Sequence, residues 1–423
     1  MIGRLFFTGA RVLDGAGGSA RDATVVVQGE RILAVGAPGA VPPPEASDTV
    51  FSLGGMTLMP GMVAGHAHLS YPNYDPADLN SVDMNLPPTA VAILAAKNAE
   101  VTLKAGFTAA AGAGSLHQID RVLKDLIRKG TIPGPRLMAC GQDIMPTAGG
   151  MDLKPTWWKL GMTGLPLIAD GPIEMRRAVR LQAKEGNDFI KIYPQGGHGV
   201  PDRGMDMEYD EIEACVRAAH DKGKLVRAHV VTKPAIMACL KAGVDILDHA
   251  DGIDDEACDL IARQGVFILP SLYLATVMPQ YYVPPGAGDP GERLKVAFDK
   301  AAAKLARAQA AGVKIVTGDD FGNKLTPHGD NGKELAVYTD LLGQPAMDVI
   351  TWATRNGAEM MRKDKEFGTV APGKLADLLV VDGDPVADMK LLGDPANLAM
   401  VMQGGRFVTS RLKRQDAPAP AHV

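Results

Sequence analysis

The chain has 423 residues, enough for two or three small domains or for one large α/β barrel with an attached segment. Its 49 acidic and 44 basic residues give a formal net charge of −5, which argues against a nucleic-acid-binding surface. Charged residues make up 22% and hydrophobic residues 46%, which excludes a disordered chain. No apolar run approaches the ~18 residues of a membrane helix, and the N-terminus lacks the apolar stretch of a signal peptide. We therefore expect a cytoplasmic protein that binds neither nucleic acid nor membranes.

The two ends of the chain share a pattern of short strands. RLFFTGARVLD and ATVVVQGERILAVG near the start are rich in β-branched and aromatic residues, and so are ADLLVVDG and LAMVMQGGRFVTS near the end. We expect residues 1–57 and 369–412 to form one composite β-sandwich domain. Residues 413–423 have no hydrophobic pattern and are predicted to be a loose tail.

Residues 58–368 alternate between strand and helix patterns. Segments such as DRVLKDLIRKG and YDEIEACVRAAHDKG carry apolar residues at helical spacing, and several end in glycine. Eight strand–helix units over about 300 residues predict an α/β fold, a (β/α)₈ TIM barrel with the β-sandwich appended. A doubly wound sheet is the alternative, but no GxGxxG opens a helix after the first strand. The predicted strands are Leu58–His68, Gly106–Ala111, Arg136–Gly141, Asp188–Tyr193, Leu225–His229, Asp245–His249, Val266–Pro270 and Val313–Gly318.

Two stretches of this middle part, residues 143–171 and 271–293, are longer than ordinary loops. Loops of that length are typically lids or binding loops. Their aromatic residues either pack a lid or offer apolar walls to a substrate, and the sequence leaves both readings open; these residues are Trp157, Trp158, Tyr281 and Tyr282.

Four of the nine histidines stand at the ends of predicted strands. His66 and His68 are two residues apart, so both imidazoles lie on one face of a strand. His229 and His249 end two later strands. Active sites of TIM barrels lie at the carboxyl ends of the strands, and imidazole is a common metal ligand. Any one of these histidines alone could be a core residue, but the four together predict a metal site.

Asp320 and Lys191 add two chemically distinct candidates. Asp320 follows the last predicted strand and offers an anionic oxygen. Lys191 lies within the apolar strand DFIKIY, where a bare ammonium is costly. Either the lysine snorkels toward solvent or pairs with a carboxylate such as Asp188, or carbon dioxide converts it to a carbamate that bridges two metal ions.

The chain resembles the amidohydrolase superfamily, within it the imidazolonepropionase-like group that includes metal-dependent dipeptidases and ochratoxinase-like amide hydrolases. The matching motifs span nearly the whole chain: PGMVAGHAH, AGFT, DFIKI, VRAHVV, AGVDILDH, TGDDFG and APGKLADLLVVDGDP. The resemblance implies two divalent metal ions, expected to be zinc, bridged by N6-carboxylated Lys191. One ion would be held by His66, His68 and Asp320 and the other by His229 and His249. It also implies a homo-oligomer that acts on small molecules.

Three positions depart from the family pattern. Ala64 stands where the family has an aspartate before the HxH motif, and Asp319 replaces a threonine. Of Asp319 and Asp320 we expect the second to bind metal, because its spacing from Gly318 and Gly322 matches. Met151 stands where the peptidase branch often has a histidine, which weakens a simple peptidase assignment.

These residues predict a binuclear metal-dependent amidohydrolase. A metal-bridging hydroxide would attack an amide bond in an N-acyl amino acid, a dipeptide or an ochratoxin-like xenobiotic, with Asp320 as the catalytic proton carrier. Tyr193, His198 and His328 are the predicted substrate contacts. The alternatives are hydrolysis of a cyclic amide, a lactone or ester, or a carbamate or urea at the same site, and last a non-enzymatic binding protein.

Overall fold

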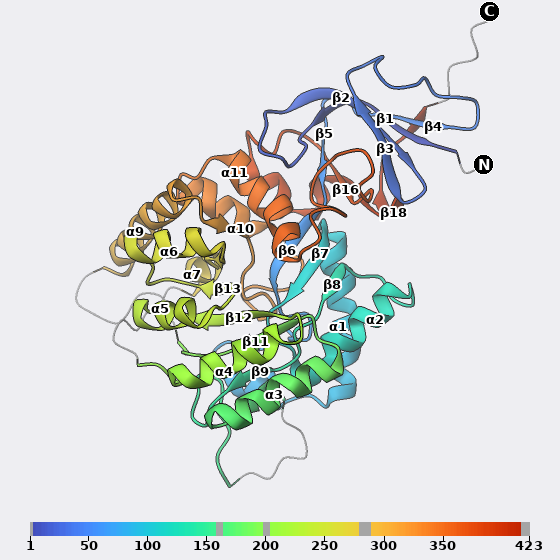
Figure 1. The fold of residues 1–423 in the computed structure, drawn as a ribbon. Helices are drawn as coiled ribbons and strands as arrows, with labels where there is room; N and C mark the ends of the chain where they lie inside the picture. The colour runs from blue at the N-terminus through green and yellow to red at the C-terminus, as the bar shows by residue number, and fades with distance from the viewer. Residues whose placement is uncertain (1–2, 158–163, 198–203, 279–288, 416–423) are drawn as a thin grey trace, which may run out of the picture.

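The structure is a computed structural model that describes residues 3–157, 164–197, 204–278 and 289–415. Strands from both ends of the chain lie together at one end of the molecule, and the alternating strands and helices form the larger body beside them (Figure 1). The predicted substrate residue His198 and the aromatic residues Trp158, Tyr281 and Tyr282 lie outside the described residues.

The terminal strands form one nine-stranded sheet. Its order is β18-β17-β16-β5-β1-β2-β3, with β4 paired to both β1 and β19. The two ends of the chain meet where β16 runs antiparallel to β5, with Leu379 opposite Met59. The strands are β1 (Leu5–Val12), β2 (Arg21–Gln28), β3 (Arg31–Gly36), β4 (Thr49–Ser52), β5 (Thr57–Pro60), β16 (Leu378–Val381), β17 (Leu398–Gln403), β18 (Arg406–Ser410) and β19 (Arg414–Gln415).

This sheet joins both termini, but its strands are hydrogen-bonded into one sheet, so a two-layer sandwich stays a prediction. Strand β5 runs across residue 58, where the sequence placed a domain boundary. Strand β19 lies within the predicted tail and pairs with β4. The exact domain limits therefore also stay predictions.

The central strands fall into two parallel sheets. One has the order β6-β7-β8 and the other the order β10-β9-β11-β12-β13-β14-β15. Backbone hydrogen bonds connect the sheets on both sides, from Gly65 N–H to the Thr317 carbonyl at 3.0 Å and from Phe189 N–H to the Ala139 carbonyl at 3.1 Å. The strands are β6 (Met62–Ala67), β7 (Phe107–Gly112), β8 (Arg136–Met138), β9 (Asp143–Met145), β10 (Pro166–Ile168), β11 (Phe189–Ile192), β12 (Leu225–Val230), β13 (Ile246–His249), β14 (Phe267–Leu269) and β15 (Lys314–Ile315).

Every predicted central strand overlaps an observed one, but the predicted loop at residues 143–171 was only partly a loop. It contains β9 and β10, which pair in parallel, and β9 also pairs with β11 through Ile144 and Ile192. Each of these two strands has three residues. A strand that short shows no periodic pattern, and its neighbours in the sheet stabilise it instead. The second predicted loop likewise contains the short helix α7 (Tyr273–Val277).

Helices cover the outside of the central strands (Figure 1). The predicted glycine stops are confirmed, for example at Gly243, whose φ of 89° ends α5. Within the described residues, no helix is both long and apolar enough to cross a membrane. The helices are α1 (Pro88–Lys104), α2 (Ile119–Arg128), α3 (Gly171–Glu185), α4 (Tyr209–His220), α5 (Lys233–Ala242), α6 (Asp255–Gln264), α9 (Pro290–Ala310), α10 (Lys333–Ala336), α11 (Ala346–Thr351) and α12 (Gly357–Met360). Short 3₁₀ segments are η1 (Leu79–Val82), η2 (Leu116–Gln118), η5 (Met389–Gly393) and η6 (Pro395–Asn397), and π-helical segments are η3 (Val337–Leu341) and η4 (Trp352–Asn356).

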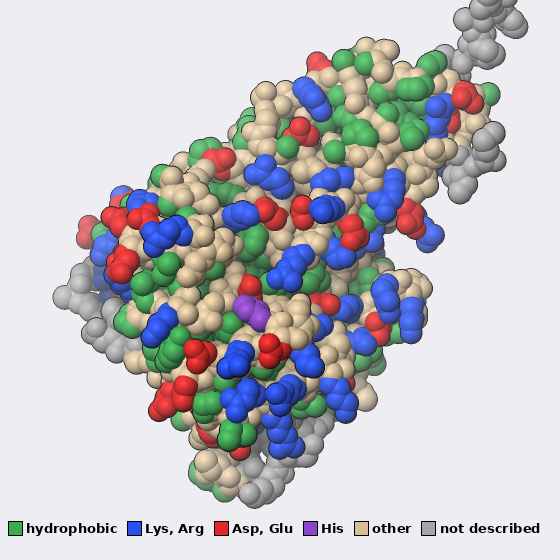
Figure 2. Space-filling model, viewed as in Figure 1, with side chains coloured by type: hydrophobic (Ala, Val, Ile, Leu, Met, Phe, Trp, Pro, Cys, Tyr) green, Lys and Arg blue, Asp and Glu red, His purple; other side chains and the backbone are tan. Residues whose placement is uncertain are grey.

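The two sides of the central strands bury different groups of apolar residues. Inward-facing residues such as Val63, Phe189 and Ile246 pack in one cluster, while Leu247 and Ile268 pack against the helices. On the face shown in Figure 2, acidic and basic side chains are mixed, in keeping with the small net charge. The central strands themselves thus form an apolar core, and the candidate site described below is built from polar groups near their carboxyl ends.

Candidate metal centre

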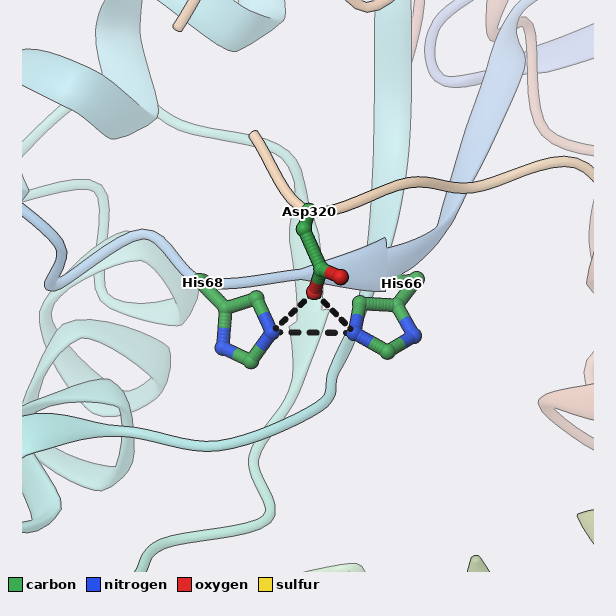
Figure 3. Close-up of side chains that lie close together, drawn as sticks. All are labelled: His66, His68 and Asp320. Carbon is green, nitrogen blue, oxygen red and sulfur yellow. Dashed lines mark hydrogen bonds and ion pairs between the residues drawn. The ribbon is translucent and has the colours of Figure 1, made fainter. Parts of the chain in front are cut away.

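Three side chains converge beyond the carboxyl ends of β6 and β15, two strands that belong to different central sheets. His66 lies in β6, His68 follows it, and Asp320 follows β15. The two imidazole Nε2 atoms are 2.9 Å apart, and Asp320 Oδ1 lies 3.0 Å from His66 Nε2 and 3.1 Å from His68 Nε2 (Figure 3). These three residues form a possible metal-binding group.

The hydrogen bonds of the two imidazoles show that this group fits a cation. His68 Nδ1 lies 3.0 Å from the Gly114 carbonyl oxygen, which only accepts, so Nδ1 carries the proton and Nε2 presents a lone pair. Burial lowers the pKa of His68 to about 4, so this ring is neutral at pH 7. Burial alone would also lower the pKa of His66, but the charges of Asp248 and Asp320 raise it. The surroundings of His66 therefore favour a positive charge.

Lys191 lies directly beside this group and is fully buried in β11. Its Nζ is 2.5 Å from Asp248 Oδ2. The prediction that Asp188 is the partner of Lys191 was wrong, because Asp188 Oδ2 accepts a hydrogen bond from Lys124 Nζ. Asp188 and Lys191 are three positions apart in an extended segment, so their side chains lie on opposite faces.

His229 and His249 extend the set of imidazoles. The ring centroid of His249 lies 5.4 Å from that of His66 and 4.4 Å from that of His229. The backbone at His249 and Ala250 has φ values of 70° and 55°, a left-handed conformation that is uncommon outside glycine and concentrates at functional sites. Ring contacts thus link His229 and His249 to His66, and Lys191 is connected to His66 through Asp248. Among the described residues, the group close enough together to hold a metal ion is His66, His68 and Asp320, so the other three ligands stay predictions.

Comparisons with known proteins show the family of the chain. The amidohydrolase family matches residues 57–408 of the chain. The chain belongs to the amidohydrolase family. It is thereby a hydrolase that acts on carbon–nitrogen bonds, and enzymes of this family act on small molecules.

Individual relatives cover nearly the whole amidohydrolase chain. It is 28% identical to ochratoxinase from Aspergillus niger over 94% of this chain and 85% of that protein. A prolidase structure complexed with N-methylphosphonate-L-proline is 28% identical, with a TM-score of 0.82 over 96% of this chain and all of the other. A Xaa-Pro dipeptidase structure with bound methionine is also 28% identical, with a TM-score of 0.80 over 96% and 99%. These neighbours imply the TIM-barrel fold with its α/β content, while the central strands of the described residues pair into two sheets and not into one closed barrel.

Asp319 and Asp320 point to different partners. Asp320 faces the histidines, whereas Asp319 accepts hydrogen bonds from the N–H groups of Leu274, at 3.0 Å, and of Asp320, at 2.7 Å. Burial would raise the pKa of Asp320, but the charge of His66 and the close contacts with both imidazoles hold it well below its usual value. Asp320 is therefore the ionised carboxylate of the site.

Two tyrosines stack on the histidines from opposite ends of the cluster. The ring of Tyr193 stacks on His229 at 4.1 Å, and that of Tyr71 stacks on His68 at 4.2 Å. His328 Nε2 lies 3.0 Å from the Tyr71 carbonyl oxygen, so it donates there and holds the segment that carries Tyr71. Substrate contacts by Tyr193 and His328 stay predictions.

Sequence reasoning missed four residues around the cluster: Tyr71, Asp143, Arg227 and Asp248. Asp143, in β9, is buried, and burial raises its pKa to about 7. Asp248 and Arg227 contact the site directly. Both could have been found by the argument used for Lys191, because each is a charged residue inside an apolar strand, in DILDH and LVRAHV.

A cavity of about 500 Å³ lies beside His249. It is bounded by the ends of β12, β13 and β14 and by α7 and α9, and its walls include Ile253, Leu272 and Phe298. Its volume is in the range that binds small organic molecules, and its walls are mainly apolar.

Proposed function

We propose that the chain is a metal-dependent hydrolase that cleaves the amide bond of an N-acyl amino acid, a dipeptide or a xenobiotic amide of the ochratoxin type. The observation that carries this proposal is the convergence of His66 Nε2, His68 Nε2 and Asp320 Oδ1 within 3.1 Å of one another. Similarity to ochratoxinase and to a prolidase over nearly the whole chain supports the amide bond as the target.

The proposed centre holds two divalent ions. His66, His68 and Asp320 would hold one ion and His229 and His249 the other, with carboxylated Lys191 between them. The amine of Lys191 would add to carbon dioxide and release a proton, so that a carbamate oxygen is available to each ion. Zinc suits these nitrogen and oxygen ligands. The ions would supply Lewis acidity and lower the pKa of the attacking water.

The residues of the chain would carry the proton and hold the substrate. Asp320 is ionised and partly exposed, so it can take a proton from the attacking water and pass it to the leaving nitrogen. Tyr193 and His328 would contact the polar groups of the substrate, as would His198 in the segment outside the described residues. The cavity beside His249 favours a substrate with an apolar group.

A second candidate keeps the same centre and changes the bond: a cyclic amide, a lactone or ester, or a carbamate or urea. Met151 favours it, because the peptidase branch often has a histidine there. A panel of N-acyl amino acids, lactones and aryl carbamates separates the two, since turnover confined to the last two classes would contradict the first proposal. Absence of turnover on every class would leave a binding protein.

Metal analysis and a Lys191→Ala variant test the binuclear centre. We expect about two divalent ions per chain in the wild type. The variant should lose hydrolysis while the chain still folds, although it unfolds more easily because Asp248 loses a buried partner. Lys124→Ala is the matched control, since it removes a lysine–aspartate pair outside the site and should keep activity. Near-wild-type turnover by folded Lys191→Ala would exclude the carbamate bridge. A single ion after addition of zinc and bicarbonate would favour a mononuclear centre.

A further inference from the structure

Arg227 is a fully buried arginine that spans the interior between the two central sheets. It lies in β12, and its Nη1 donates to the Gly112 carbonyl at 2.7 Å and to the Gly65 carbonyl at 3.2 Å. Both carbonyls belong to strands of the other sheet, β6 and β7. Gly65 is the residue immediately before His66, so this arginine holds the backbone of the strand that carries the first histidine pair.

The other edge of the same guanidinium holds Asp248. Arg227 Nη2 lies 2.5 Å from Asp248 Oδ1 and Nε lies 3.1 Å from Oδ2, a two-pronged contact that fixes the plane of the carboxylate. Asp248 Oδ1 is also 3.2 Å from His66 Nδ1, while Arg227 Nη2 lies farther from that nitrogen, at 3.4 Å. Asp248 Oδ2 accepts from Lys191 Nζ at 2.5 Å.

We infer that Arg227 is a positioning residue for the metal centre. Through Asp248 it sets the orientation and the tautomer of His66, so that Nε2 faces His68 and Asp320. Through the Gly65 carbonyl it sets the strand on which His66 stands. Partners of this kind behind metal-binding histidines typically change metal affinity by about 10–100-fold when they are removed.

The buried charge of Asp248 explains why position 227 has an arginine. Asp248 has no exposure to solvent and contacts two cations, Arg227 and Lys191. Conversion of Lys191 to a carbamate removes one of those positive charges, and Arg227 then balances Asp248. A lysine could not contact both carboxylate oxygens and two backbone carbonyls in one plane.

This inference rests on the proposed function, so its test measures metal binding rather than turnover. We suggest measuring zinc affinity by competition with a chromophoric chelator for the wild type, Arg227→Met and Arg227→Lys. The expected result is at least about tenfold weaker zinc binding by Arg227→Met and an intermediate loss for Arg227→Lys. Arg136→Met is the matched control, because Arg136 forms the same two-pronged pair with Asp377 away from the centre. It should unfold more easily but bind zinc within about twofold of the wild type.

The outcomes separate the inference from the function on which it rests. Folded Arg227→Met that binds zinc as tightly as the wild type would overturn the inference alone. If Arg227→Met does not fold, the zinc affinities of Asp248→Asn and Arg227→Lys test the inference instead. Unchanged zinc affinity in both variants would overturn the positioning role. A wild type that binds no divalent ion would overturn the proposed function together with the inference. A loss of affinity in Arg136→Met as large as in Arg227→Met would show a general effect of destabilisation and overturn the positioning role.

Discussion

The most informative residues are the buried charges, because each must be paired to be tolerated in the core. Lys191, Arg227 and Asp248 are each at most 1% exposed, and both cations contact Asp248. Such a cluster is a weak source of stability. Its contact with His66 through Asp248 supports the proposed role, which is to hold that imidazole in one orientation.

At the residue scale, Asp320→Asn and Asp319→Asn test which aspartate serves the centre. The Asp320 variant loses the ionised oxygen that faces both histidines, so we expect hydrolysis to fall by at least about 10³-fold and metal binding to weaken. The Asp319 variant should keep its metal and unfold about 1–2 kcal/mol more easily, because an amide nitrogen cannot accept one of the two N–H groups that Asp319 binds. Metal analysis, kinetics and urea unfolding of both variants check this. The reverse pattern would show that the two assignments must be exchanged.

At the element scale, the distance between β6 and β15 determines whether the ligands meet. Gly65 lies where these strands touch, and a Cβ on it would come within 2.5 Å of the Thr317 carbonyl oxygen and 2.6 Å of Val316 Cγ1. Asp320 follows the same segment, so any separation of the strands moves it away from His66. The close approach therefore serves the site as well as the core.

Gly65→Ala should force these strands apart. We expect a loss of about 1–3 kcal/mol in the free energy of unfolding, from the added methyl group in a packed interior, together with weaker zinc binding. Urea unfolding and zinc competition measure the two effects. Gly54→Ala is the control, since nothing lies within 4 Å of its Cβ position and a change below about 0.5 kcal/mol is expected. Wild-type stability and affinity in Gly65→Ala would mean that the strands are not held at this distance.

At the scale of the whole molecule, a small polar junction joins the barrel to the terminal sheet. Asp377 accepts from Arg136 Nε at 2.7 Å and Nη2 at 3.1 Å and from Gly404 N–H at 2.7 Å. Gln403 Nε2 also donates to the Thr108 carbonyl at 2.9 Å. These bonds connect residues far apart in sequence and lie away from the metal centre.

Asp377→Ala should therefore affect stability without affecting the site. We expect a loss of about 1–3 kcal/mol, below the value for a fully buried pair because Arg136 is partly exposed, and unchanged zinc affinity. Calorimetry and zinc competition provide the measurements. Asp382→Ala removes a pair in which both side chains are about half exposed, and it should cost less than about 1 kcal/mol. Equal effects of the two substitutions would mean that the junction does not hold the sheet to the barrel.

The sequence by itself determined the features that depend on local pattern. Period-two spacing placed His66 and His68 on one face, and apolar runs predicted eight segments that each overlap an observed central strand. Family motifs extended this to the barrel and to the amidohydrolase chemistry. Substrate identity lies beyond such patterns, because it depends on loops that follow no period.

Tertiary structure alone decided the features that depend on contacts between distant residues. It replaced Asp188 with Asp248 as the partner of Lys191, showed that Asp319 accepts backbone N–H groups while Asp320 faces the histidines, and revealed the short strands β9 and β10. Adjacent residues of one strand share a sequence context but face opposite sides, so only the packed neighbours show which side bears a ligand. A three-residue strand is too short to have a period, and its hydrogen bonds come from partners more than twenty residues away.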